Sequence, residues 1–81
     1  MMTVLDGRNS NRVPEIIQIS DYKVFETRLI TNENVQCLII NDCYVPCVKN
    51  DGMYSDKYEY ILCAAYKTYH GFANWYKRQY I

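Results

Sequence analysis

The residues of greatest chemical reactivity in this 81-residue chain are four cysteines and one histidine: Cys37, Cys43, Cys47, Cys63 and His70. Structural zinc sites usually take their ligands as two closely spaced pairs, and the intervals between these residues do not follow that pattern. In an extended strand, Cys43 and Cys47 would stand about 13 Å apart, too far for one metal ion or one disulfide. We therefore predict no metal and no cofactor, with the thiols packing as small apolar groups.

Cys63 and His70 form the only candidate pair for nucleophilic catalysis. On a helix they would lie two turns apart, about 10 Å, which is beyond the reach of a direct hydrogen bond. The chain has no glycine-rich phosphate loop and no serine-nucleophile motif. These observations predict that the protein is not an enzyme, and a thiol or metal-dependent enzyme is the least favoured interpretation.

The C-terminal segment 67–81 interleaves positive and aromatic side chains. Such a surface can contact phosphates and stack bases, so direct RNA or DNA binding is the alternative function. Its residues would be Lys67, His70, Trp75, Lys77, Arg78 and Tyr80. The same residues also suit a packed helix with cations near its C-terminus, and the net charge of zero provides no overall field toward nucleic acid.

The elements that must position these residues form a predicted α+β fold. Runs of β-branched and aromatic residues, separated by turn-forming residues, indicate a small antiparallel β-meander of three or four strands. With Asn41-Asp42 as a two-residue loop, Ile40 faces Cys43, and a turn over residues 31–34 places Ile30 opposite Val35. The strands are expected at about 15–20, 22–31, 35–40 and 43–48. Pro46 cannot donate a ladder hydrogen bond, which favours an edge position or a bulge for the last strand.

A helical period follows Gly52 and predicts a C-terminal helix over residues 55–80. Ser55 suits its N-cap, and Gly71 is compatible either with a break or with one continuous helix. Apolar residues recur at spacings of three and four, and their stripe is expected to cover the sheet face that carries Leu38 and Val45. These residues are Tyr58, Ile61, Leu62, Ala65, Tyr69, Phe72 and Tyr76.

The length supports one domain, residues 15–81, preceded by a flexible or late-docking arm over residues 1–14. On the other sheet face, apolar residues would be exposed unless the arm or a second copy of the chain, in a homodimer, covers them. These residues are Val24, Ile30, Val35, Ile39, Tyr44 and Val48. No apolar run suits a signal peptide or a membrane span, so we expect a cytoplasmic protein that does not bind a membrane.

Nine tyrosines and one tryptophan give the chain many residues of the kind that dominate protein interfaces. We predict a small non-enzymatic module that binds a host protein or protein complex. Its composition leans toward AT-rich codons, as in many phage genes, and we expect a phage or mobile-element inhibitor that blocks a host defence protein or nuclease complex. The predicted partner-binding residues are Trp75, Arg78, Lys67, Tyr60, Arg28 and Tyr44.

Overall fold

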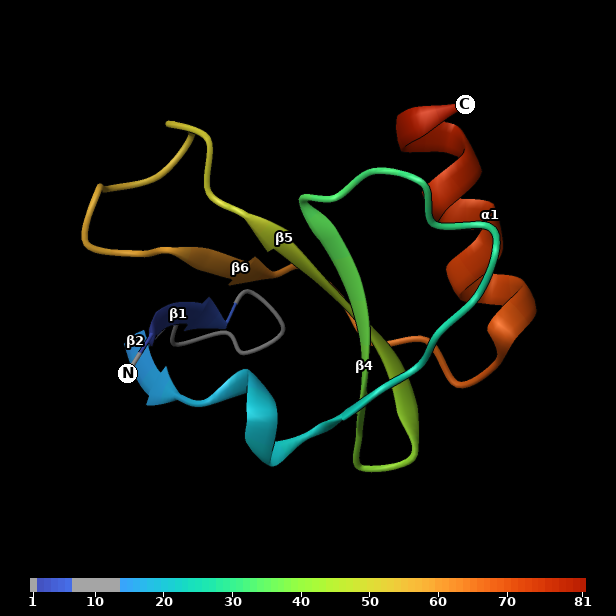
Figure 1. Cartoon of the computed structure of the whole chain (residues 1–81), viewed down its shortest axis with the longest axis horizontal. Coiled ribbons are helices and arrows are strands. Elements are labelled where there is room, and N and C mark those ends of the chain that lie inside the picture. Colours follow the sequence, from blue (N-terminus) through green and yellow to red (C-terminus); the bar gives the residue numbers. More distant parts are fainter. Residues whose placement is uncertain (1, 7–13) are drawn as a thin grey trace.

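The computed structural model describes residues 2–6 and 14–81, and it confirms a small α+β fold with one C-terminal helix (Figure 1). The described residues form a six-stranded mixed sheet in the order β2-β1-β6-β5-β4-β3, in which only the β1–β6 pair is parallel. Within residues 2–6 and 14–81, no helix is long and apolar enough to cross a membrane. The elements are β1 (Met2–Asp6), β2 (Pro14–Ile17), β3 (Lys23–Val24), β4 (Val35–Ile40), β5 (Cys43–Lys49), β6 (Tyr60–Leu62) and α1 (Tyr69–Tyr80).

The β4–β5 hairpin confirms the prediction made from its turn. Asn41 and Asp42 have φ angles of 52° and 63°, the left-handed conformation that a two-residue hairpin loop requires. Ile40 pairs with Cys43, and the register continues to the pair Val35 and Val48. A local turn signal therefore fixed which side chains share each face of this hairpin.

The predicted strand 22–31 is wrong except at Lys23–Val24, and its predicted pairing with β4 is also wrong. Val24 pairs with Leu38, whereas the predicted register places Thr27 opposite Leu38. The shift is three residues, an odd number, so the side chains of this strand lie on the opposite sheet face from the one predicted. Residues 25–34 leave the sheet and lie beside α1. The Tyr76 hydroxyl accepts hydrogen bonds from the backbone N–H groups of Thr31 at 3.0 Å and Asn32 at 3.1 Å. This helix contact replaces the strand ladder that the sequence pattern favoured.

The first predicted strand, 15–20, is also shorter than expected. Strand β2 ends at Ile17, and a single 3-10 turn, Ile19–Asp21, follows it. Residues 2–6 of the expected arm form β1, which pairs with both β2 and β6. Residues 1 and 7–13 of that arm lie outside the described residues.

The helix begins at Tyr69, and the prediction of a helix from residue 55 is wrong for its first fourteen residues. The Thr68 hydroxyl caps the N-terminus of the helix by accepting a 3.1 Å hydrogen bond from Gly71 N–H. Gly71 therefore lies in the first turn of the helix and does not interrupt it. A Cβ on Gly71 would lie 3.3 Å from a Tyr66 ring atom. Glycine at this position therefore lets the preceding chain pack closely against the helix.

Proline 46 lies in a central strand, contrary to the expected edge or bulge. Strand β5 pairs with β4 along one side and with β6 along the other. The β6 ladder ends at Leu62, opposite Cys47, and the next residue, Cys63, donates its N–H to the Pro46 carbonyl at 3.4 Å. Pro46 is tolerated here because it sits immediately beyond the last paired residue of β6.

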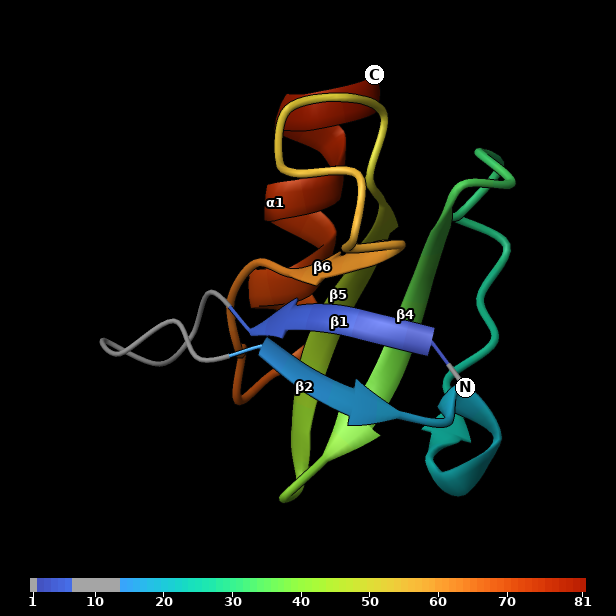
Figure 2. The ribbon, with the colours of Figure 1, turned by 90° about the vertical axis from the view of Figure 1, so that its left-hand side faces the viewer.

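The sheet curls so that its two faces contribute to two separate cores. Figure 2 shows β1 and β2 crossing steeply over β4 and β5. The first core (core 1) lies on the Leu38 face and includes Val4 of β1, with Tyr22 packed at its side. Its buried residues are Val4, Leu38, Ile40, Val45, Cys47 and Leu62.

Helix α1 covers the opposite sheet face from the one predicted. The second core (core 2) consists of Val35, Cys37, Phe72 and Tyr76. Tyr44, Val48 and Ile30 pack against it, so the helix covers much of the face that was expected to need the arm or a second copy of the chain. The predicted apolar patch is therefore largely part of the interior.

Candidate functional site

The loop between β5 and β6, residues 50–59, is organised by one side chain, Asn50. Its Oδ1 atom accepts hydrogen bonds from the N–H groups of Gly52 and Tyr54, both at 3.2 Å. Its Nδ2 atom lies within donor distance of three carbonyl oxygens, those of Tyr54 at 3.2 Å, Ser55 at 3.0 Å and Tyr58 at 2.8 Å. The Asn50 N–H also donates to the Glu59 carbonyl at 2.9 Å. The loop is thereby fixed around a central amide.

This loop holds large apolar side chains in solvent. Met53 is 83% exposed and Tyr54 is 40% exposed. Gly52, immediately before them, has a φ of 107°, a conformation that glycine adopts without the steric cost other residues would have. The loop geometry thus fixes two adjacent apolar residues at the surface instead of folding them inward.

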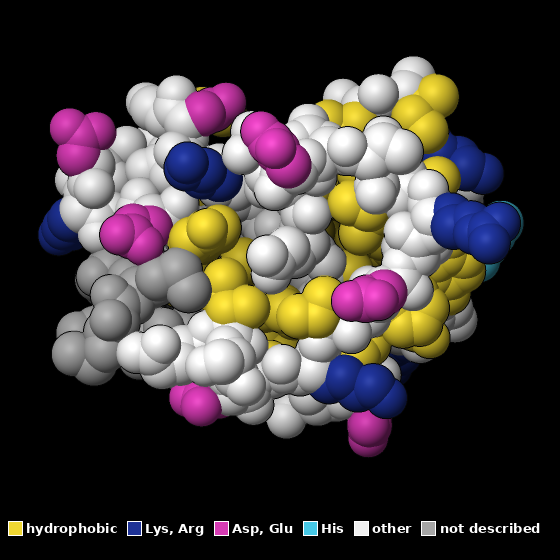
Figure 3. All heavy atoms as spheres, in the orientation of Figure 1, with side chains coloured by type: hydrophobic (Ala, Val, Ile, Leu, Met, Phe, Trp, Pro, Cys, Tyr) yellow, Lys and Arg dark blue, Asp and Glu magenta, His cyan; other side chains and the backbone are white. Residues whose placement is uncertain are grey.

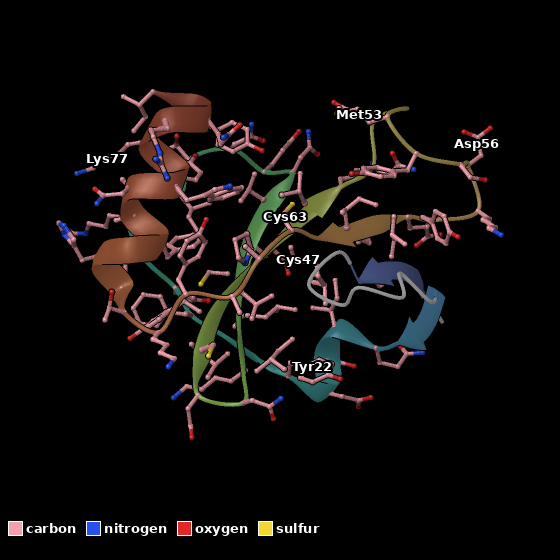
Figure 4. The ribbon with its side chains drawn as sticks, turned by 180° about the vertical axis from the view of Figure 1, so that it is seen from behind. Tyr22, Cys47, Met53, Asp56, Cys63 and Lys77 are labelled. Atoms are coloured by element: carbon pink, nitrogen blue, oxygen red, sulfur yellow. The ribbon has the colours of Figure 1, made fainter. Side chains whose placement is uncertain are left out.

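Two hollows at the loop and the C-terminal end of α1 share Asn50, Asp51 and Tyr80 in their linings. We treat them together and call them the Tyr80 groove, with each hollow as one end. One end is polar and is lined by Asn32, Asn34 and Asp51. The other end is more apolar, and it is lined by Met53, Tyr54, Ile61, Cys63 and Tyr80 among others. Figure 4 shows Cys63 between the loop that carries Met53 and the helix that carries Lys77.

Two ionisable groups of the groove, the Cys63 thiol and the Tyr80 hydroxyl, have raised pKa values. Desolvation by neighbouring parts of the chain raises the pKa of the Cys63 thiol above its ordinary value of 9.0, although the residue as a whole is exposed. Burial, with smaller contributions from Cys63, Tyr76 and Asp51, raises the pKa of the Tyr80 hydroxyl. Among the described residues, no group of three or more His, Cys, Asp or Glu side chains could hold a metal ion.

A second hollow lies on another side of the molecule, between β4 and the segment 25–34. Figure 3 shows hydrophobic side chains gathered along it. Val24, Phe25, Ile30, Val35 and Cys37 line it. Phe25, Ile30, Val35 and Cys37 also belong to core 2 or pack against it, so these residues already serve the packing of residues 25–34 on the sheet.

The residues predicted for partner binding do not form a single surface. Tyr60 packs against core 1, whereas Tyr44 and Trp75 pack against core 2 on the other sheet face. All three are half-buried. Arg28, Lys67 and Arg78 are exposed, and they come from a loop, the segment before α1 and the helix itself.

The residues of the alternative nucleic-acid site are exposed cations, a half-buried Trp75 and an exposed Tyr80 whose ring contacts other rings. Lys67, His70, Lys77 and Arg78 are exposed. The Tyr80 ring lies 4.9 Å from the Tyr76 ring and 5.9 Å from the Trp75 ring, measured between centroids. The aromatic rings therefore contact one another and the core.

Sequence reasoning missed the residues that build the groove, above all Asn50, Met53 and Tyr54. The predicted helix included residues 55–62, but residues 55–59 belong to the loop that forms the groove and residues 60–62 to strand β6. A signal was present in the segment KNDGMYSDKY, where an apolar pair stands within a run of turn-forming and charged residues. Such a pattern indicates a loop that exposes its apolar pair to solvent.

Comparison of the chain with protein-family models, with curated proteins and with solved structures gave no match.

Replacing Asn50 with alanine should loosen the loop and flatten the groove. The substitution removes the side-chain hydrogen bonds to residues 52–58, and we expect the free energy of unfolding to fall by about 1–3 kcal/mol. Hydrogen exchange of the Gly52 and Tyr54 amides should accelerate at least tenfold. Asn74→Ala, at an exposed helix position, is the matched control: it should leave exchange at both amides unchanged and should not lower the free energy of unfolding, since alanine favours the helix. Unaltered exchange at both amides in Asn50→Ala would show that the side chain does not organise the loop.

Proposed function

We propose that the chain is a small non-enzymatic protein-binding module whose partner occupies the Tyr80 groove. The observation that carries the proposal is the 83% exposure of Met53 on a loop that Asn50 fixes by several hydrogen bonds. Holding a large apolar side chain in water is unfavourable, and clustered exposed apolar groups typically mark interaction surfaces.

The composition of the groove supports a protein as the partner. Methionine adapts its shape to a bound surface, and tyrosine combines apolar area with a polar hydroxyl, so both are enriched at protein interfaces. A loop that is already ordered loses less conformational entropy on binding than a flexible one. Met53, Tyr54 and Tyr80 therefore provide apolar contacts on a preorganised support.

The partner that we propose is a host protein or protein complex, which the chain would block as a phage or mobile-element inhibitor. Size and composition support this part of the proposal. The groove itself supports the binding of a protein, by a surface that needs no catalytic group.

The test replaces Met53 with aspartate and compares the variant with wild type as bait in a lysate of the host cells. We expect the wild-type chain to retain a specific protein, and Met53→Asp to reduce its affinity at least tenfold with the melting temperature unchanged. Val24→Asp introduces the same charge at another exposed apolar residue and should retain the partner. Equal affinity of Met53→Asp and wild type for the recovered protein would contradict the proposed site, and recovery of no specific protein would contradict the function.

A further inference from the structure

The outer face of α1 is a basic surface directly beside the groove. Phe72, Ala73 and Tyr76 are buried on the inner side of the helix. With a helical period of 3.6 residues, the opposite side presents His70, Asn74, Lys77 and Arg78, and all four are exposed. These positions form one continuous surface along the helix.

Helix α1 and the segment that precedes it carry no acidic side chain of their own. Residues 60–81 contain Lys67, Lys77 and Arg78 and no aspartate or glutamate. The helix dipole favours cations in the last turn, which accounts for the position of Lys77 and Arg78. It does not account for the absence of carboxylates. An acid four positions before each cation would form an ion pair with it, but Ala73 stands four positions before Lys77 and Asn74 four positions before Arg78.

The basic surface and the groove meet at the C-terminal turn of the helix. Lys77 lies three residues before Tyr80, which lines the groove, and Ile81 beyond it is 81% exposed. The loop on the other side of the groove carries Asp51, Asp56 and Glu59 against Lys57, with Lys49 also lining the groove, so this side has one more acid than bases. The two walls of the groove therefore differ in charge, and a bound partner would meet cations on the helix side.

We infer that the partner is a protein segment with an apolar anchor residue and neighbouring carboxylates, and that the carboxylates lie over the outer face of α1. This inference rests on the proposed function and adds the chemistry and orientation of the partner. The apolar anchor contacts Met53, Tyr54 and Tyr80. The carboxylates pair with Lys77 and Arg78, which increases the association rate through long-range attraction.

A protein segment fits this surface better than a nucleic acid does. Base stacking without sequence preference needs several free aromatic faces. Here Trp75 is half-buried against core 2, and Tyr80, which is 38% exposed, has its ring beside those of Trp75 and Tyr76. Three cations would release few counterions, so their contribution to nucleic-acid binding would be small at physiological salt. Both features favour an acidic partner segment with an apolar anchor.

The experiment selects binders from a displayed library of random 15-residue peptides at 150 mM salt, with the full chain as bait. We expect enriched peptides to contain an aromatic or aliphatic residue with Asp or Glu nearby. The double variant Lys77→Glu/Arg78→Glu should bind these peptides at least tenfold more weakly, whereas Lys23→Glu, a charge reversal on β3, should bind them as wild type does. Circular dichroism checks that each variant is folded.

The outcomes separate this inference from the proposed function. If the enriched peptides fail to bind Met53→Asp but contain no excess of Asp or Glu, the groove remains the binding site and the inference of an acidic partner is wrong. Acidic peptides unaffected by Lys77→Glu/Arg78→Glu would overturn the assigned orientation. If a 20-nucleotide single strand bound with submicromolar affinity at 150 mM salt and the double variant abolished this binding, the partner would be a nucleic acid and the inferred protein segment would be wrong. Failure to enrich any peptide would overturn the inference, while a protein recovered from lysate through Met53 would still support the proposed function.

Discussion

Replacing Phe72 with alanine should lower the free energy of unfolding more than any other change described for this chain, by about 3–5 kcal/mol. Phe72 has no exposed surface, and its ring lies 5.8 Å from that of Trp75 and 6.4 Å from that of Tyr76. Removing a buried phenyl ring costs about 3–5 kcal/mol, through lost burial and the cavity left behind. A domain of this length has a total stability of about 4–12 kcal/mol, so the loss is a large fraction of it.

Urea unfolding followed by circular dichroism measures this effect. His70→Ala, two residues earlier on the exposed side of α1, should change the free energy of unfolding by less than about 0.5 kcal/mol. If Phe72→Ala were as stable as His70→Ala, the helix would not be packed on the sheet as described.

Raising the pH above 9 should destabilise the protein steeply. Burial raises the pKa of the Cys37 thiol from 9.0 to about 11, although a hydrogen bond with the Val45 backbone acts in the opposite direction. Burial, and to a smaller extent Cys63, raises the pKa of the Cys47 thiol from 9.0 to about 12. In the folded state both thiols therefore remain protonated at a pH where they ionise in the unfolded state.

The direction of this pH effect follows from the number of protons that the folded and unfolded states bind. Between pH 9 and 11 the folded chain binds more protons than the unfolded chain, so the free energy of unfolding falls as the pH rises. Each thiol contributes about 1.4 kcal/mol per pH unit, and the two together about 2.7 kcal/mol. Hydrogen bonds from Thr31 and Asn32 outweigh desolvation and lower the pKa of Tyr76, which offsets part of this loss above the lowered pKa.

Urea titrations from pH 8 to 10.5, with a reducing agent present, give the slope directly. The variant Cys37→Ala/Cys47→Ala should be less stable at pH 8, because core volume is lost, but its stability should depend less on pH. A slope identical to that of wild type would show that these two thiols are not the source of the alkaline loss.

The parts of the fold that the sequence predicted correctly depend on local signals. The β4–β5 hairpin followed from Asn41-Asp42, whose conformational preference defines both the turn and the register. The C-terminal half of the expected helix followed from the spacing of Phe72 and Tyr76, both fully buried. In these segments, neighbouring residues carry enough information to specify the structure.

The errors arose where tertiary contacts chose between two local patterns. Ile61 and Leu62 fit a helical stripe, yet they pair as a strand with Leu5 and Asp6 of β1 on one side and with β5 on the other. Residues 22–31 suit a strand, but the chain leaves the sheet after Val24, and Tyr76 binds the backbone of Thr31 and Asn32 beside the helix. Because these partners are distant in sequence, periodicity alone could not identify them.

The groove was the least predictable feature, since it depends on Asn50 binding backbone groups up to eight residues away. The sequence shows the amide and the exposed Met53-Tyr54 pair, but not the loop conformation that brings them to the end of α1. The exposed cations of that helix, in contrast, were recognisable as candidates from the sequence. Sequence reasoning thus identified the exposed cations beside the proposed binding groove but not the loop that forms its other wall.

The central claim, that a protein partner occupies the groove beside Met53, can be tested in one NMR titration. The chain has three methionines and a single tryptophan, so the Met53 methyl and the Trp75 indole N–H give separate reporters. Adding the recovered partner should shift or broaden the Met53 methyl signal strongly and change the half-buried Trp75 indole signal much less. An unchanged Met53 methyl signal at saturating partner, with a large shift at Trp75, would contradict the account and place the interface on the helix flank around Trp75.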